Sequence, residues 1–276
     1  MPNLAAVIVN YDDSERISKL VKKLESYNIL SYIIISDNNS SEKEKKIINN
    51  IQNGVIKVLY NNENLGFSGA NNRALNYLKE FNIDYVFTIN SDVIVSKETM
   101  QSSVDFLEKH KEISLVSAEM IENENKKQCF YNFPTIKHAI AENLGLIKIF
   151  HIKPKKVKEY NEYYTCDYIR SSYWCVNYND FTNINFFDTN TFLYHVETCV
   201  GIKLHRKGKK CAILKNYTYQ HNHIYKDGYK IRGYKDSYKS LLYIFKEYYN
   251  KTKFELELYK ASYWIGLILR KILRIK

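Results

Sequence analysis

The sequence predicts an α/β fold: a Rossmann-like, mostly parallel sheet with helices on both faces and a helical extension at the C-terminus. Three observations support this fold class. Over about the first 120 residues, apolar runs of strand length alternate with segments of helical periodicity, which implies crossovers between parallel strands. The run at residues 85–89 is β-branched and aromatic throughout, as in a strand that is buried on both faces. Four successive runs end in polar loops, and such loops meet at one edge of a parallel sheet.

The expected elements of the first half follow in chain order from this pattern. We expect strands at residues 4–9, 32–35, 56–60, 85–89 and 113–118. We expect helices at residues 14–27 and 42–51, from the end of the loop at residue 71 to about residue 81, and at residues 97–110. Ser14 has the side chain of an N-cap at the start of the first of these helices.

The second half of the chain has a less regular pattern. Residues 121–160 contain prolines and a lysine-rich stretch, and we expect a loop or short helices there. The apolar and aromatic segment at residues 164–176 is expected to form a strand. Apolar side chains recur at helical spacing between residues 238 and 249, and residues 254–276 predict a basic amphipathic helix.

The net charge of +11 is unevenly distributed along the chain. Residues 1–225 hold 28 Lys and Arg against 25 Asp and Glu, whereas residues 226–276 hold 13 against 5. A basic tail on a nearly neutral body predicts an anionic partner, either membrane lipid or nucleic acid. The sequence shows no RNP, zinc-finger or helix-turn-helix signature, so we do not expect the partner to be nucleic acid.

The cysteines and the apolar runs predict a cytoplasmic protein. The five cysteines include no C-x-x-C pair, which argues against a disulfide framework and a zinc site and for a reducing compartment. The N-terminus lacks the basic segment and apolar core of a signal peptide. No apolar run approaches the roughly 20 residues that a membrane-spanning helix needs.

The C-terminal segment at residues 254–276 combines an apolar, aromatic stripe with Arg and Lys. This composition is typical of a helix that lies on an anionic membrane surface. We therefore expect a peripheral protein on the inner face of the cell membrane. The alternative is that this helix packs on the rest of the chain or on a second copy of it in a homodimer.

Two acidic residues follow strands at the predicted edge. Asp92 follows the central apolar run, where a carboxylate can hold a divalent cation, and oxygen ligands suit Mg²⁺ or Mn²⁺. Asp37 follows the second strand and can accept hydrogen bonds from a base or a ribose. Gly66 and Gly69 flank a helix start, which favours phosphate. The local alternatives are an Asx turn at Asp92, a helix N-cap at Asp37, and a turn with positive φ at the glycines.

Four motifs together resemble a family 2 glycosyltransferase of the GT-A fold, in the rhamnosyltransferase-like branch that builds bacterial surface polysaccharides. They are VIVNYDD, the loop at residues 36–40, NENLGFSGANN and INSDV, and neither G-x-G-x-x-G nor a P-loop occurs. The resemblance implies that Asp92 is a metal ligand, in a motif that usually reads Asn-Pro-Asp, and that Asp37 contacts uracil or thymine. The implied nucleotide-binding residues are Asn10, Tyr11, Asp37, Asn64, Gly66, Phe67, Asn71, Asn90 and Ser91.

The resemblance continues at residues 185–198, where the family has Gly-Phe-Asp followed by Phe-x-Tyr-x-Glu-Asp. Thr198 stands in place of the Asp that activates the acceptor hydroxyl, which leaves Glu197 as the first candidate base and Asp188 as the second. The alternative for Glu197 is a surface carboxylate on a helix. The segment YTYQHNH matches the place where the family has a His near the donor diphosphate or metal. His221 is the candidate and His223 the reserve, and the alternative is that both are surface residues.

The resemblance implies inverting transfer of a sugar from a UDP- or dTDP-sugar, with Mn²⁺ or Mg²⁺ as cofactor. The implied acceptor is a glycan or a lipid-linked oligosaccharide in capsule, O-antigen or cell-wall polysaccharide synthesis. Residues 1–125 would bind the nucleotide sugar, residues 126–225 would hold the acceptor and the base, and residues 226–276 would form the tail. Because Thr198 replaces the family's base, the alternative is a catalytically inactive GT-A module that binds nucleotide or glycan.

Overall fold

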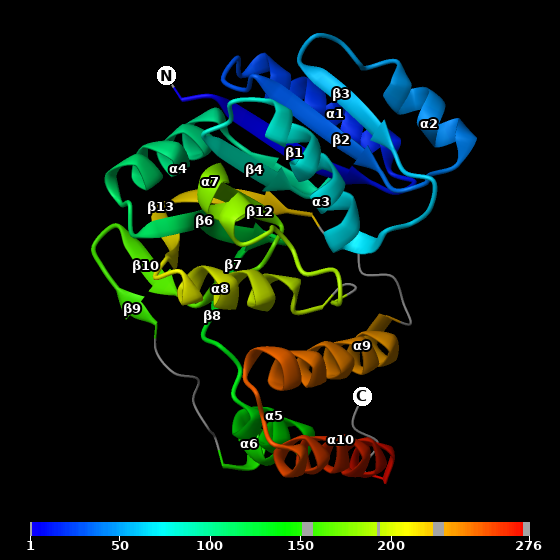
Figure 1. Cartoon of the computed structure of the whole chain (residues 1–276), viewed down its shortest axis with the longest axis vertical. Coiled ribbons are helices and arrows are strands. Elements are labelled where there is room, and N and C mark those ends of the chain that lie inside the picture. Colours follow the sequence, from blue (N-terminus) through cyan, green and yellow to red (C-terminus); the bar gives the residue numbers. More distant parts are fainter. Residues whose placement is uncertain (1, 151–156, 192–193, 223–228, 273–276) are drawn as a thin grey trace.

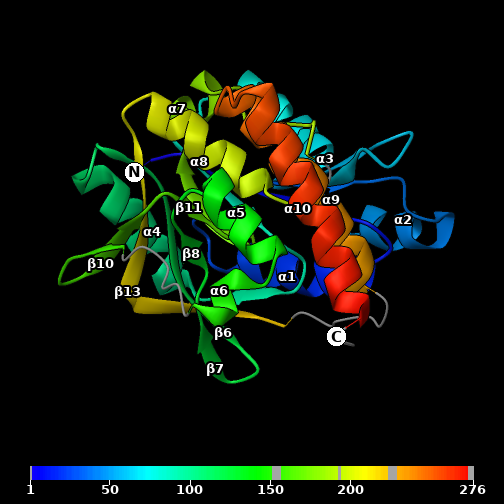
Figure 2. The same ribbon diagram turned by 90° about the horizontal axis from the view of Figure 1, so that it is seen from below.

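A computed structural model describes residues 2–150, 157–191, 194–222 and 229–272 of the chain. In these residues a mixed sheet forms the body of the molecule. Helices α1, α2 and α4 lie on one face of the sheet and α3, α7 and α8 on the other, while α5, α6, α9 and α10 form a further layer at one end (Figures 1 and 2).

The strands have the following bounds: β1 (Leu4–Asn10), β2 (Tyr32–Asp37), β3 (Ile56–Tyr60), β4 (Tyr85–Ile89), β5 (Val93–Val95), β6 (Ile113–Glu122), β7 (Asn125–Lys127), β8 (Phe130–Tyr131), β9 (Lys158–Glu159), β10 (Tyr163–Cys166), β11 (Tyr168–Ile169), β12 (Tyr173–Asn177) and β13 (Lys210–His221). The order along the main sheet is β3-β2-β1-β4-β12-β6-β13-β10-β9. β5 pairs with β13, β7 pairs with β6, and β8 and β11 form a separate ribbon.

The helices have the following bounds: α1 (Ser14–Ser26), α2 (Glu42–Asn49), α3 (Gly66–Tyr77), α4 (Lys97–Lys109), α5 (Ile136–Asn143), α6 (Leu146–Ile149), α7 (Tyr178–Asn183), α8 (Val196–Arg206), α9 (Tyr229–Tyr243) and α10 (Lys253–Ile272). A 3₁₀ turn, η1 (Leu78–Glu80), follows α3, and a π-helical turn, η2 (Ile244–Tyr248), follows α9.

The predicted α/β fold class is confirmed. β1 pairs in parallel with β2 and β4, and β2 pairs in parallel with β3, so the carboxyl ends of these strands meet at one edge. Antiparallel β12 lies between β4 and β6. β6 continues to Glu122, beyond the predicted end at residue 118, and this carries its end toward the same edge.

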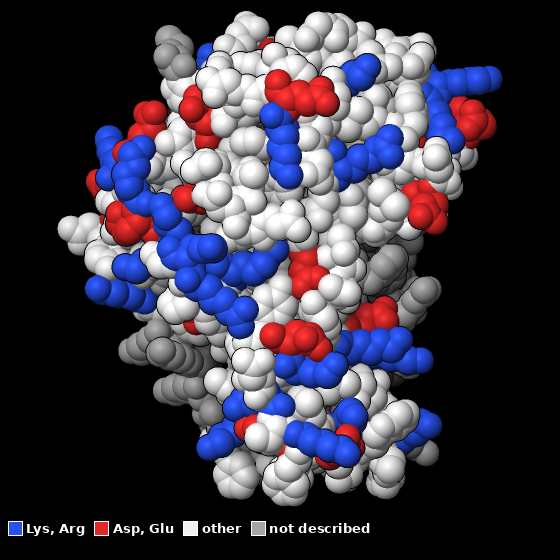
Figure 3. Space-filling model, viewed as in Figure 1, with Lys and Arg blue, Asp and Glu red and all other residues white. Residues whose placement is uncertain are grey.

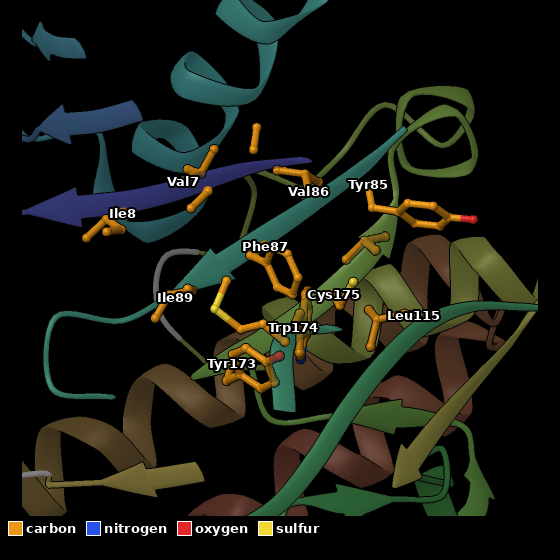
Figure 4. Close-up of a cluster of buried hydrophobic side chains, with 14 of the residues drawn as sticks. Val7, Ile8, Tyr85, Val86, Phe87, Ile89, Leu115, Tyr173, Trp174 and Cys175 are labelled. Carbon is orange, nitrogen blue, oxygen red and sulfur yellow. The ribbon is translucent and has the colours of Figure 1, made fainter. Parts of the chain in front are cut away.

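The side chains of β12 show how the two faces of the sheet are filled. Tyr173 lies on the face of α4, where its hydroxyl is 3.1 Å from Ser103 Oγ and its ring stacks on Phe87 at 6.1 Å. The next residue, Trp174, lies on the opposite face and stacks on Phe187 at 5.6 Å. Figure 4 shows both rings in a cluster with side chains of β1, β4 and β6. Because both faces are covered, the central strands are apolar throughout.

Three local predictions are wrong. Residues 164–176 do not form one strand but parts of β10, β11 and β12, which pair with β13, β8 and β4 respectively. The chain turns away at Asp167, whose carboxylate accepts a hydrogen bond from the Phe133 N–H at 2.7 Å. Ser14 is not an N-cap: Asp13 precedes the helix and Ser14 is its buried first residue. The loop was expected to reach residue 71, but helix α3 begins at Gly66, which agrees with the helix start expected beside Gly66 and Gly69.

The C-terminal layer has its own small core of aromatic side chains. Tyr238 of α9 stacks on Tyr263 of α10 at 3.8 Å, and Tyr259 packs against Phe245. α10 approaches α5 so closely that a Cβ at Gly266 would overlap the backbone of Asn143. Both predicted C-terminal helices are therefore present and packed, the second as far as Ile272, and its predicted residues 273–276 lie outside the described residues. Within the described ranges, no helix combines the length and the apolar character needed to cross a membrane.

Candidate active site

A buried hydrogen-bond network joins the ends of β1 and β2. The Asn10 side-chain amide donates to Asp37 Oδ1 at 2.7 Å and to the hydroxyls of Ser14 and Ser40 at 3.1 Å each. The Ser40 N–H donates to Asp37 Oδ2 at 3.2 Å. Asp37 is not the N-cap of α2, because Ser41 occupies that position. The network fixes the Asp37 carboxylate at the edge of the sheet.

A second network joins the loop after β2 to the start of α3. The Asn38 amide donates to Asn64 Oδ1 at 2.8 Å, and Asn38 Oδ1 accepts from the Leu65 N–H at 2.8 Å. Asn64 Oδ1 also accepts from the Gly66 N–H at 2.9 Å. Gly66 has a φ of +69°, a conformation that glycine adopts without strain. The predicted nucleotide residues Asn64 and Gly66 are therefore tied to the loop that carries Asp37.

The remaining predicted nucleotide residues on this side differ in exposure. Tyr11 is 56% exposed at the end of β1. Phe67 is partly buried, and its ring forms a T-shaped pair with the Phe187 ring at a centroid distance of 5.5 Å. The buried Asn71 side chain donates to the Phe67 carbonyl at 2.9 Å, within its own helix. Asn71 thus braces the first turn of α3.

The turn at residues 90–92 is held on three sides. Ser91 Oγ donates to Asp13 Oδ2 at 2.6 Å, which ties the turn to the start of α1. The Asn90 N–H donates to the Ser172 carbonyl at 2.9 Å, at the start of β12. The Asp92 carbonyl accepts from the Asn222 N–H at 2.9 Å, just after β13. The segment is therefore a turn, which was the local alternative proposed for Asp92. The same turn also places the Asp92 carboxylate at the edge of the sheet.

The structure brings Asp92 and His221 together. In the antiparallel pair of β5 and β13, His221 lies opposite Val93, and His221 Nε2 is 3.3 Å from Asp92 Oδ1. The two side chains are 10% and 9% exposed. His223, the reserve candidate, lies outside the described residues.

The donor set of Asp92 and His221 fits a divalent cation. Adjacent ligands in octahedral geometry at about 2.1 Å from the ion lie about 3 Å apart. Carboxylate oxygen suits Mg²⁺ and Mn²⁺, and imidazole nitrogen is a ligand of transition-metal ions. Among the described residues there is no group of three or more His, Cys, Asp or Glu side chains placed to hold a metal. An ion here would therefore take its other ligands from water or from substrate phosphate.

Glu197 lies in the first turn of α8 and is partly buried. Burial raises the pKa of the Glu197 carboxyl, and a backbone hydrogen bond and the charge of Arg170 offset this only in part. Thr198 is completely buried, with its hydroxyl 3.4 Å from His195 Nδ1. Position 198 therefore faces the interior, and a carboxylate there would lose its hydration.

Asp188 is saturated with hydrogen bonds. Oδ2 accepts from the hydroxyls of Tyr243 at 2.9 Å and Tyr248 at 2.6 Å. Oδ1 accepts from the backbone and side-chain N–H groups of Asn190, each at 2.9 Å. Burial alone would raise the pKa of Asp188, but the bonds from Tyr248, Asn190 and Tyr243 together lower it. A carboxylate in this state is a weak base.

Sequence reasoning missed three residues that connect the predicted ones. Asn38 links the loop after β2 to the start of α3, and its place in an Asn- and Ser-rich loop was the only signal. Glu122 Oε1 lies 3.7 Å from His221 Nδ1, on the far side of the ring from Asp92. Arg170, whose charge acts on Glu197, lies two residues from Ser172, which binds the turn of Asp92. Of the second-half candidates, His221 is thus held beside Asp92 on one side and Glu122 on the other.

A hollow of about 930 Å³ lies at the opposite end of the sheet. Its walls include Asp84, Tyr85 and Tyr178, at the start of β4 and just after β12. None of the predicted site residues contributes to its lining as described. The predicted residues instead gather at the carboxyl ends of the parallel strands, where ligands bind in open α/β sheets.

Comparison with known sequences identifies relatives of the chain. The sequence model of Glycosyl transferase family 2 matches residues 5–170. The rhamnosyltransferase WbbL of Escherichia coli (strain K12) is 26% identical over 220 residues, which cover 72% of this chain and 78% of that protein.

Comparison with solved structures identifies similar folds at low sequence identity. Residues 1–349 of TarS from S. aureus, solved with UDP-GlcNAc, match with a TM-score of 0.62 at 13% identity, over 99% of this chain and 76% of that one. The mannosyltransferase PcManGT from Pyrobaculum calidifontis, solved with GDP-Man and Mn²⁺, gives 0.60 at 10% identity, over 97% and 73%. GalNAc-T7, solved with UDP, GalNAc and Mn²⁺, gives 0.59 at 13% identity, over 83% of this chain and 45% of that one.

The Asn10 network provides a test of how Asp37 is held. Asn10→Ala should lower the free energy of unfolding by about 1–3 kcal/mol, because the buried carboxylate loses its amide donor. Asn76→Ala is the control, since Asn76 is an exposed residue of α3 and such changes usually stay within about 0.5 kcal/mol. Chemical denaturation measures both. Equal stability of Asn10→Ala and the parent would show that this network does not hold Asp37.

Proposed function

The chain belongs to glycosyl transferase family 2, and from this premise we propose that it transfers a sugar with inversion from a UDP- or dTDP-sugar to a glycan or lipid-linked acceptor. The process served is the synthesis of a bacterial surface polysaccharide. The observation that carries the proposal is the approach of Asp92 to His221 at 3.3 Å, at the edge that also holds Asp37. Names of relatives agree with it: WbbL is a rhamnosyltransferase, and TarS and PcManGT were solved with nucleotide sugars.

The donor lies across the ends of β1, β2 and β4. Asp37 accepts hydrogen bonds from the base, while Asn10 and Ser40 keep its carboxylate in place. The N-terminus of α3 begins at Gly66, and the positive end of its helix dipole at the edge favours phosphate. Ser91 and Asn90 position the turn beneath the diphosphate.

Asp92 and His221 would hold the divalent cation, Mn²⁺ or Mg²⁺. When bound, such a cation neutralises charge on the departing diphosphate. In the transfer step, Glu197 takes the proton of the acceptor hydroxyl. At the same time the hydroxyl oxygen of the acceptor forms a bond to the anomeric carbon of the donor sugar. The bond from that carbon to the phosphate oxygen breaks, and its electron pair leaves with the nucleoside diphosphate. Attack from the face opposite the leaving group inverts the configuration.

Glu197→Gln tests the base directly. The change keeps the size of the side chain but removes its basicity, so the transfer rate should fall at least about a hundredfold with donor affinity unchanged. Glu98→Gln, an exposed residue in the first turn of α4, is the matched control. A Glu197→Gln enzyme as active as the parent would exclude Glu197 as the base.

The pH dependence of transfer should report the same group. A base acts only when deprotonated, and burial raises the pKa of Glu197. The rate should therefore fall as the pH is lowered through this raised pKa, at a higher pH than an ordinary Glu would give. A rate that stays constant down to the usual range of Glu would contradict this.

Asp92→Asn and His221→Ala test the cation site. Each should weaken Mn²⁺ binding in the presence of UDP by at least about tenfold, because even a lost outer-shell partner commonly costs that much. Asp105→Asn, an exposed residue of α4, is the control. Mn²⁺ titrations followed by electron paramagnetic resonance give the affinities. Full transfer activity in excess EDTA would remove the metal from the proposal.

Peripheral association with the inner face of the membrane is part of the proposed function. α10 buries Tyr259, Ser262, Tyr263 and Gly266 but leaves another apolar face in solvent. Trp264 is 62% exposed, Ile268 58% and Ile272 69%, and Phe150 just after α6 is 69% exposed. Lys and Arg side chains lie over this layer, with some Asp and Glu side chains among them (Figure 3). An apolar face beside cationic side chains suits an anionic lipid surface.

Replacement of both Trp264 and Ile268 by Ser tests this face. Both are exposed, so the fold should persist, while binding to vesicles rich in phosphatidylglycerol should fall by about tenfold or more. Ile94→Ser, an exposed residue of β5, is the control, and cosedimentation measures binding. Unchanged binding would exclude this face as the anchor. Loss of a concentration-dependent dimer in the double variant would instead assign the face to a second copy of the chain.

The second candidate function is a GT-A module that binds nucleotide or glycan without catalysis, and it rests on the buried Thr198. Donor hydrolysis with Mn²⁺ separates the two. Release of UDP or dTDP from a panel of nucleotide sugars supports the enzyme. Nucleotide binding without hydrolysis or transfer supports the module.

A further inference from the structure

The π-helical turn η2 brings two tyrosines to one side of the C-terminal segment. On an α-helix, residues five apart point about 140° away from each other. In η2 the Tyr249 N–H instead bonds the Ile244 carbonyl at 3.1 Å, five residues back. This wider turn carries Tyr248 to the same side as Tyr243.

The two phenols meet at a single oxygen. Both donate to Asp188 Oδ2, and Tyr243 OH also accepts from the Asn190 amide at 3.1 Å. Burial and the hydrogen bond to Asp188 together raise the pKa of Tyr243 to about 12. The same two causes raise the pKa of Tyr248. The phenols therefore stay protonated donors at neutral pH. The π-helical turn thus allows Tyr243 and Tyr248 to bond the same carboxylate, and we call this pair of hydrogen bonds the Asp188 clamp.

The clamped loop is also fixed to the donor side of the molecule. Beside Asp188, the backbone of Phe187 forms two hydrogen bonds of 3.0 Å with the Asn72 amide of α3. The Phe187 ring lies against Phe67 and Trp174. The loop around Asp188 is thus held between the helix that begins the donor site and the C-terminal segment.

The C-terminal segment also contacts the helix that carries the proposed base. His195 is the residue before α8, and the distance from its Nε2 to Ser237 Oγ of α9 is 2.9 Å. Burial lowers the pKa of His195 to about 4, so this contact is between neutral groups. Ile244 of η2 packs against Cys199 and Ile202 of α8, and Arg206 bonds the Tyr248 carbonyl.

We propose that Tyr243 and Tyr248 are positioning residues for transfer: through Asp188 they hold residues 185–191, the described segment that precedes α8 in the chain, so that Glu197 meets the acceptor hydroxyl. Asp188 is then an anchor, and not a second base. The catalytic part of this inference rests on the proposed function of Glu197. The anchoring part rests on the contacts of Asp188 alone.

The test uses Tyr243→Phe, Tyr248→Phe and the double variant in the full-length protein. Phenylalanine keeps the packed rings and removes only the hydroxyls. The double variant should lower kcat/KM for the acceptor by about ten- to hundredfold, because small displacements of catalytic groups have effects of that size. The affinity for UDP should be unchanged. Hydrogen exchange of residues 185–191 should become faster.

Tyr249→Phe is the matched control. Tyr249 adjoins η2, and among the described residues its buried hydroxyl has no hydrogen-bond partner. Its removal should change neither the acceptor kinetics nor the exchange of residues 185–191. If Tyr249→Phe lowered kcat/KM for the acceptor as much as the double variant does, any change near η2 would disturb the enzyme. That result would overturn the specific role of the Asp188 clamp.

Asp188→Asn separates an anchor from a base. An anchor variant should retain measurable transfer, and in the double-tyrosine background the change should add little further loss, since all three residues act through one contact. Complete loss of transfer by Asp188→Asn, with the tyrosine variants unaffected, would overturn the proposal. If the parent protein transfers no sugar, the proposed function fails. Independently of that, an unchanged hydrogen-exchange rate of residues 185–191 in the double-tyrosine variant would reject the role of Asp188 as an anchor.

Discussion

The pairing of β5 with β13 is the contact on which the candidate site depends. It sets His221 opposite Val93 and so beside Asp92, and the Asn222 N–H fixes the turn by its bond to the Asp92 carbonyl. A slip of one residue in this antiparallel pair would turn His221 to the other face of the sheet. The register of two short segments that are distant in sequence thus decides whether one or both of the proposed metal ligands lie at the site.

The strands around β5 and β13 fix the register of this pair. β13 pairs with β6 on both sides of an irregularity between Leu214 and Thr218, and its last residues also pair with β5. The same end of β6 carries Glu122 to the imidazole of His221. On the other side of β4, the parallel strands bring Asn10 and Asp37 to the edge. The side with Asn10 and Asp37 is therefore built by local βα units, and the remainder of the candidate site by long-range pairing.

This difference explains what the sequence could predict. The first strands and helices were predictable because each is encoded in a local apolar pattern, and resemblance to the family selected Asp92 and His221, which the fold brings together. The segment at residues 164–176 was mispredicted because apolar content does not specify the partner strand. The clamp on Asp188 was not predictable at all, since it depends on a π-helical turn some 55 residues away.

A crystal structure of the protein with UDP and Mn²⁺ tests the central claim most directly. The account predicts the ion between Asp92 and His221, the diphosphate beside the start of α3 at Gly66, and the uracil ring against Asp37. A nucleotide bound elsewhere, for instance in the hollow beside Asp84 and Tyr178 at the opposite end of the sheet, would contradict it.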